Sequence, residues 1–111
     1  MSGRAGRVRW LPMTDLKRVV LDVLKPHHPS IVEISKRLAL VEGVAGVNCT
    51  VYEVDQETES IKITVEGPSI NFDQIVETVE SVGAAVHSVD MVSAGSKMVD
   101  EVSTPQDKLQ R

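Results

Sequence analysis

The side chains best suited to metal chemistry in this chain are three histidines and a few carboxylates. His27 follows the first apolar segment, and His87 lies in the last one. If these segments pair as antiparallel strands, the end of the first lies beside the start of the last, with Asp22 and Asp90 a few residues along. Imidazole with carboxylate suits zinc, nickel or manganese, and carboxylates alone suit calcium. The spacing therefore allows a divalent-metal site at His27, His87, Asp22 and Asp90.

The same histidines also have an interpretation without metal. His27 and His28 are adjacent, so they chelate one ion poorly unless the loop kinks, and their spacing matches no closed motif. They would then be solvated loop residues, with His87 a strand residue bonded to a neighbour. The acids of the 55–60 connection lie at the same end, but two strands away from His87 at roughly 10 Å.

Asp22 interrupts an apolar segment that should form a central strand. On a solvated sheet face, it is the polar side of an alternating strand. On a face that docks against another subunit, a carboxylate needs a partner, and Lys62, Lys25 or a metal could supply one.

Catalytic chemistry has little support. The loop after the first strand lacks the Cys-x-x-Cys pair of a thiolate metal carrier, and the single cysteine, Cys49, is expected to be a small buried apolar residue. Ser88 neighbours His87, but adjacent strand residues point to opposite faces. The glycines fit turns and caps rather than a phosphate-binding loop. We expect no enzyme activity and no certain cofactor.

Charge and hydropathy limit the classes of partner and the compartment that we expect. The net charge is −4, and the first twelve residues hold three arginines and no acid, which leaves 9 basic against 16 acidic residues. An acidic body argues against nucleic acid, and no apolar run reaches the roughly 20 residues that cross a bilayer. One cysteine and no leader pattern favour the cytoplasm. Residues 1–14 are expected to be a disordered extension and 96–111 a polar tail, around a domain at 15–95.

Six elements follow from hydrophobic periodicity. Ser30 and Glu33 form a candidate capping box, Asn71 is a second cap, and Gly83 ends the second helix. The last strand is less regular, with a candidate bulge near Ser88. The expected strands are 16–24, 47–54, 61–66 and 85–92, and the helices begin after Ser30 and Asn71. With right-handed crossovers, this predicts a ferredoxin-like α+β βαββαβ sandwich, sheet order 4-1-3-2, with both helices on one face.

The other sheet face carries more apolar side chains than a monomer needs. The strand at 47–54 also has an unpaired edge that could accept another chain. Both features favour a homo-oligomer, although single surface aliphatic residues are common in monomers. The expected interface residues are Val20, Leu24, Tyr52 and Val54, with Val89 beside them.

The turn GVAGV at 43–47 resembles the turn from the first helix into the second strand in small metallochaperones and amino-acid-sensing domains. A closer resemblance is to an archaeal family of unknown function, domain of unknown function number 211. Three segments carry it: VVLDVLKPHHPSIVEIS at 19–35, GVAGVNCTVYEVDQETESIKITVEG at 43–67 and VHSVDMVSAG at 86–95. The resemblance implies the ferredoxin-like fold, a prokaryotic cytosolic protein and a closed multi-subunit assembly. It carries over no catalytic residue.

Three functions remain open. The first is a non-enzymatic binding or regulatory module that senses a small molecule or ion at subunit junctions, by analogy around residues 25–30. The second is a divalent-metal-binding protein. The third is an assembly or scaffold protein without a ligand.

Overall fold

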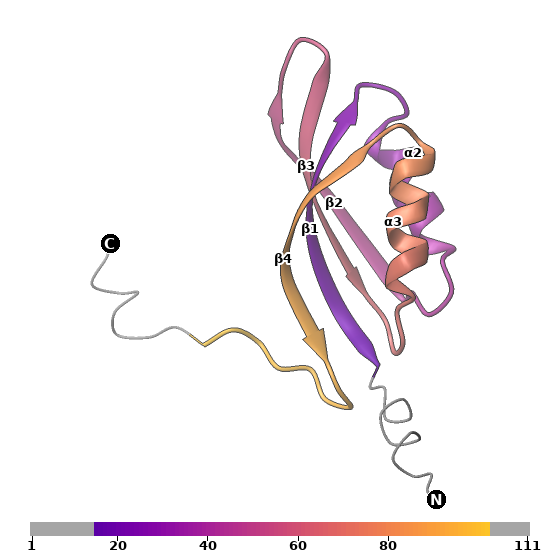
Figure 1. The fold of residues 1–111 in the computed structure, drawn as a ribbon, viewed down its shortest axis with the longest axis vertical. Helices are drawn as coiled ribbons and strands as arrows, with labels where there is room; N and C mark the ends of the chain where they lie inside the picture. The colour runs from indigo at the N-terminus through magenta and orange to yellow at the C-terminus, as the bar shows by residue number, and fades with distance from the viewer. Residues whose placement is uncertain (1–14, 103–111) are drawn as a thin grey trace, which may run out of the picture.

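A computed structural model describes residues 15–102, and the predictions for residues 1–14 and 103–111 lie outside this range. Four strands and two helices alternate along the chain (Figure 1). Their bounds are β1 Leu16–Pro26, α2 Ile31–Ala39, β2 Gly46–Val54, β3 Thr58–Glu66, α3 Phe72–Ser81 and β4 Ala85–Ala94.

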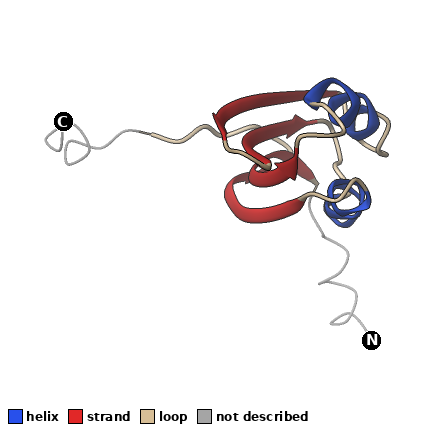
Figure 2. Cartoon of the chain, turned by 90° about the horizontal axis from the view of Figure 1, so that it is seen from above, coloured by secondary structure: helices blue, strands red, loops and turns tan. Residues whose placement is uncertain are grey.

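The strands form one antiparallel sheet in the order β2-β3-β1-β4. Both helices lie on the same side of it (Figure 2). This is the predicted βαββαβ ferredoxin-like α+β fold, with the predicted sheet order. The opposite side of the sheet, called the open face below, has no helix on it.

The core lies between the sheet and the helices. Alternate residues of the two central strands point toward the helices and are fully buried, and the apolar stripe of each helix covers them. Each such aliphatic side chain contributes about 1.5–3 kcal/mol through removal from water. The strand residues are Val19, Leu21, Val23, Ile61, Ile63 and Val65, and the helix residues are Ile34, Leu38, Ile75 and Val79.

Both predicted helix caps form. Ser30 Oγ accepts the Glu33 amide at 3.4 Å, and Asn71 Oδ1 accepts the Gln74 amide at 3.2 Å. The predicted reciprocal half of the capping box gives way to an ion pair, since the Glu33 carboxylate accepts from Arg37 Nε at 2.8 Å. Two charged partners one turn apart on the helix surface favour that pairing.

Strands β1 and β3 are both longer than the sequence pattern indicated, at the end of the sheet where the β2–β3 hairpin lies. A 2.8 Å bond from the Asp55 amide to the Thr58 carbonyl closes a tight turn, so β3 begins at Thr58. On the facing strand, β1 continues through Pro26, which lies opposite Thr58. Proline is tolerated there because β4 pairs with β1 only as far as Leu24, which leaves Pro26 at a local edge of the sheet. Glu59 is therefore a strand residue, directly opposite Lys25.

Candidate functional site

Bulges in the two edge strands disturb the alternation of side chains. In the pairing of β4 with β1, His87 and Asp90 have no partner residue on β1. In the pairing of β2 with β3, Tyr52 has no partner residue on β3. The first of these confirms the bulge predicted near Ser88. An extra residue in a strand re-aims the neighbouring side chains, and bulges are common beside functional sites.

The three bulge residues, Tyr52, His87 and Asp90, line one region of the open face. Two adjoining depressions share Asp22 and Tyr52. We call their union the open-face hollow. It is lined further by Thr50, Lys62 and Asp90 on one side, and by Val23, Leu24, Ser60 and His87 on the other.

Asp22 lies at the centre of the open-face hollow and has a hydrogen-bond partner. Tyr52 Oη donates to Asp22 Oδ1 at 2.5 Å, and this bond raises the pKa of Tyr52 because the carboxylate stabilises the neutral phenol. Lys62 is the cross-strand neighbour of Asp22, but the ion pairs within residues 15–102 do not include Lys62. The predicted alternative partner Lys25 is wrong, because Lys25 lies one step off in the alternation and is buried against Glu59.

The predicted metal quartet is divided by the fold. Asp22, Asp90 and His87 all line the open-face hollow. His27 lies elsewhere, with Nδ1 3.0 Å from Glu59 Oε2 and Nε2 3.0 Å from the Gln56 carbonyl, so both ring nitrogens have partners. Between residues 15 and 102, no three His, Cys, Asp or Glu side chains are grouped closely enough to hold a metal ion.

A second polar cluster joins β1, β3 and the loop after β1. Its members are Lys25, His27 and Glu59, and we call it the end clasp. Lys25 is fully buried, and its Nζ contacts Glu59 Oε1 at 2.9 Å, the Pro26 carbonyl at 2.8 Å and the His27 carbonyl at 3.3 Å. The pattern of alternating polarity missed this cluster, because it treated Glu59 as a loop acid. The β1–β3 register was the signal that could have revealed it.

The end clasp shifts the titration of its members. The bond to Glu59, and then the bond to the Gln56 carbonyl, raise the pKa of His27 above its ordinary 6.5. The bonds from His27 and then Lys25 lower the pKa of Glu59 below its ordinary 4.5. Each shift arises because the charged form makes the stronger hydrogen bonds.

The predicted interface residues divide between the two sides of the sheet. Val20 and Leu24 are on the open face with Tyr52; Leu24 is 44% exposed and Tyr52 is 55% exposed.

Val54 was placed on this face wrongly, since the bulge at Tyr52 shifts the alternation and pairs Val54 with Glu59. Val89 was also misplaced, because it pairs with the inward-facing Leu21. Directly opposite residues share a face.

Two other predicted features involve reactive side chains. Cys49 is partly buried against the core, and burial raises the pKa of its thiol, so it is a weak nucleophile. The argument that Ser88 and His87 must face opposite ways fails at the bulge. Ser88 pairs with Asp22, His87 lines the same face, and Ser88 Oγ donates to Asp90 Oδ1 at 2.7 Å.

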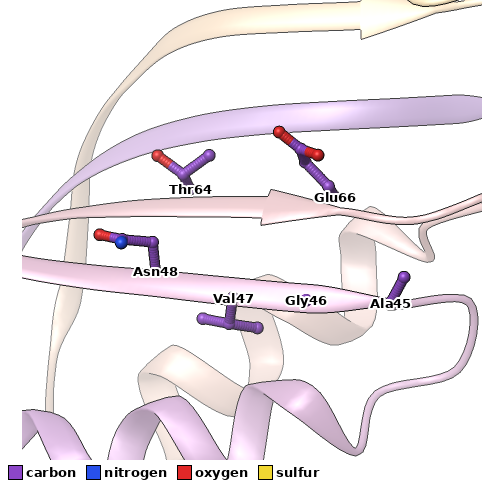
Figure 3. Close-up of a pocket in the computed structure, with 6 residues that line it drawn as sticks. All are labelled: Ala45, Gly46, Val47, Asn48, Thr64 and Glu66. Carbon is purple, nitrogen blue, oxygen red and sulfur yellow. The ribbon is translucent and has the colours of Figure 1, made fainter.

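Another depression on the open face lies near the start of β2. Figure 3 shows Asn48, Thr64 and Glu66 pointing to one side of the strands, and Val47 to the other. Glu66 pairs with Arg18 Nε at 2.7 Å, and the same guanidinium pairs with Asp100 at 2.7 Å, so one cation is shared between two carboxylates. The one charged residue that lines this depression is therefore already in an ion pair, whereas the open-face hollow is lined by Asp22, Asp90, Lys62 and His87.

The fold defines a small ferredoxin-like α+β domain with a polar hollow on its uncovered sheet face. A family model described as DUF211, Uncharacterized ArCR, matches residues 17–108. The uncharacterized protein MJ0319 of Methanocaldococcus jannaschii is 49% identical over 96 residues, which cover 86% of this chain and 99% of that protein. The chain therefore belongs to the DUF211 family, an archaeal family of unknown function, as the resemblance indicated. No helix between residues 15 and 102 is long and apolar enough to span a bilayer.

Proposed function

We propose that this protein is a non-enzymatic binding module of the cytoplasm that acts as a homo-oligomer and takes its ligand in the open-face hollow. One observation carries the proposal: Tyr52, His87 and Asp90 lie at strand bulges, and all three line the surface around Asp22. A bulged residue is not paired in the strand ladder, and bulges are common next to functional sites. Three bulged residues around one carboxylate therefore favour a binding surface. This location replaces the expected one around residues 25–30, whose side chains Lys25 and His27 are engaged in the end clasp.

The charges of the hollow favour a small ligand with a positively charged group. Asp22 and Asp90 contribute two carboxylates, against the single ammonium of Lys62. Tyr52 occupies one oxygen of Asp22, and the other oxygen can accept from an ammonium. The half-exposed ring of Tyr52 adds an aromatic face that attracts cations.

The apolar residues around the hollow favour contact with a second copy. Leu24 lines the hollow directly, and Val20 lies one step along β1 on the same face. Burial of such a surface is the usual source of association energy. Contact between open faces would place the hollow at a junction between subunits, in keeping with the closed assembly that the family resemblance implies.

A divalent cation is the second candidate ligand. His87, Asp22 and Asp90 line the open-face hollow, and imidazole with carboxylates suits zinc, nickel or manganese, while the carboxylates alone suit calcium. Within residues 15–102 these three side chains are not grouped closely enough to hold an ion by themselves, so this candidate requires them to close on the ion or a second copy to add a ligand. In this version of the site His27 takes no part. A scaffold role without any ligand is the third candidate.

Calorimetric titration with ethylamine, putrescine and glycine tests the first candidate. We expect binding of at least one amine, weakened about 10–100-fold in Asp22→Asn, because a charge-assisted hydrogen bond is lost. Glu77→Gln makes the same charge change on the helix α3 and should bind like the parent. Equal weakening in both variants, or no amine binding at all, would contradict the cationic ligand.

Thermal melts with zinc, nickel, manganese and calcium test the second candidate. A stabilising shift that disappears in His87→Ala, and persists in the matched surface variant His28→Ala, would favour a metal over an amine. If neither metals nor amines change the melting temperature or bind, the ligand-free scaffold remains.

A further inference from the structure

We infer that His27 is a pH-responsive latch, which in its protonated form ties the β2–β3 hairpin to the loop after β1. The inference is independent of the proposed ligand site. Figure 1 shows the hairpin and this loop at the same end of the molecule. The imidazole of His27 spans them, with bonds to Glu59 on β3 and to Gln56 in the hairpin turn.

The two partners of His27 require an imidazolium. Glu59 Oε2 and the Gln56 carbonyl are both acceptors, each 3.0 Å from a ring nitrogen. A neutral imidazole has one N–H, so it can donate to only one of them and must turn a lone pair toward the other. Loss of the proton therefore breaks one of the two ties, whichever tautomer forms.

The other half of the cluster gives the latch a fixed support. The Lys25 ammonium has three N–H donors, and three oxygens surround it, those of Glu59, Pro26 and His27. Because Lys25 is fully buried, this arrangement is held by packing as well as by charge. Glu59 is thus positioned by Lys25 through one oxygen, and its other oxygen is presented to His27.

The surroundings of His27 set the direction of the response. The facing groups are the Glu59 carboxylate and the Lys25 ammonium, with the acids Asp55 and Glu57 in the hairpin. The α3–β4 turn lies against Pro26 at Gly83 and consists of uncharged residues. The bond to Glu59 is the largest influence, and it raises the pKa of His27. The latch is therefore closed at mildly acidic pH and opens as the pH rises through the raised pKa of His27.

The opening has a local structural consequence. The Asp55 to Thr58 backbone bond still closes the turn, but only one of the two bonds from His27 to Glu59 and Gln56 remains. Leu24 and Ser60 line the open-face hollow and are the chain neighbours of Lys25 and Glu59. The latch therefore lies one residue away from the rim of the hollow on both β1 and β3.

Ring-nitrogen NMR on the full chain tests the protonation directly. With three histidines in the sequence, each can be followed in one titration. We expect the midpoint of His27 to lie above that of the exposed neighbour His28, and to fall toward it in Glu59→Gln. A His27 midpoint equal to or below that of His28 would overturn the inference.

Hydrogen exchange of the amides at residues 55–58, corrected for intrinsic rates, tests the motion. Protection in the parent should drop about two- to tenfold as the pH rises through the His27 midpoint, the worth of one lost hydrogen bond. His27→Gln should show low protection with no such step, whereas His28→Gln should behave like the parent. A step that persists in His27→Gln, or its absence from the parent, would contradict the latch. Melting temperatures of the variants show that each one is folded.

Discussion

At the scale of single residues, Lys25 is the least expected side chain. An amine is rarely buried completely unless all its protons have acceptors, and here three acceptors meet the three donors. Proline supplies one of these acceptors through its carbonyl, at the last position of β1. Lys25 is therefore the last inward-facing residue of β1, and all three of its N–H groups have acceptors. It lies between the apolar core and the polar loop that follows β1.

Lys25→Met keeps the length of the side chain and removes the donors. We expect a loss of about 1–3 kcal/mol in the free energy of unfolding, because the part-buried carbonyls of Pro26 and His27 lose their hydrogen-bond donor. Lys36→Met on the exposed surface of α2 is the matched control and should stay within about 0.5 kcal/mol of the parent. Urea denaturation measures both variants. Equal values for the two would show that the buried contacts of Lys25 add nothing.

The pH dependence of stability belongs to the same residues. The pKa of His27 is raised in the fold, so its contribution is complete below the ordinary 6.5 and is lost as the pH rises through the folded value. The pKa of Glu59 is lowered, so its contribution is complete above the ordinary 4.5 and is lost as the pH falls through the folded value.

The stability difference between the parent and His27→Gln should therefore be largest between about pH 4.5 and pH 6.5. It should decline on both sides of that window. Urea unfolding of the two proteins from pH 4 to pH 9 measures it. A difference that grows above pH 7 would have the wrong sign for this cluster.

At the scale of elements, two turns make a close backbone contact. A Cβ at Gly67, after β3, would lie 1.9 Å from the Gly43 carbonyl, in the turn between α2 and β2. Gly43 has a φ of +86°, and a Cβ there would meet the Ser69 carbonyl at 1.6 Å. Glycine is needed at both positions because the backbones touch, and this contact fixes the turn before β2 against the turn before α3.

Gly67→Ala should destabilise the protein by about 1–3 kcal/mol, because backbone atoms must move to accept the methyl group. Gly46→Ala is the control, since a Cβ at Gly46 has no heavy atom within 4 Å. That variant should be neutral or slightly stabilised through the unfolded state. Thermal unfolding compares the two, and a similar effect of both would argue against the contact between the turns.

At the scale of the whole molecule, the open face is the side of the sheet that no helix covers. Helices bury one side of the sheet, and the other side combines the charged hollow with aliphatic residues. A mixed face of this kind suits association that leaves the hollow hydrated while the apolar rim is buried.

Light scattering at tens of micromolar tests the proposed homo-oligomer, and a monomer would contradict it. Leu24→Asp places a charge on the open face and should shift the mass toward the monomer, because an unpaired charge would be buried. Leu40→Asp, after α2, changes a residue that is 86% exposed and should leave the mass unchanged. A shift caused by Leu40→Asp alone would move the interface to the end of that helix.

The sequence by itself determined the element order, the buried faces of the two central strands and of both helices, both helix caps, the sheet order and the family. These depend on local periods and cap chemistry, which are written in neighbouring residues. The helix stripe with Ile34 and Leu38 is one example, and the cap at Asn71 is another. The alternation also placed Asp22 and Leu24 correctly on the open face.

Only the tertiary structure decided where the chemistry lies. A bulge adds one residue to one strand, so its position depends on the pairing with the neighbouring strand and not on the strand's own alternation. Bulges lie at His87 and Asp90, on the strand beside Asp22, and the bulge at Tyr52 moved Val54 to the other side. The register of β1 and β3 likewise joined Lys25 and His27 to Glu59, and so divided the histidines that the sequence had grouped at one end.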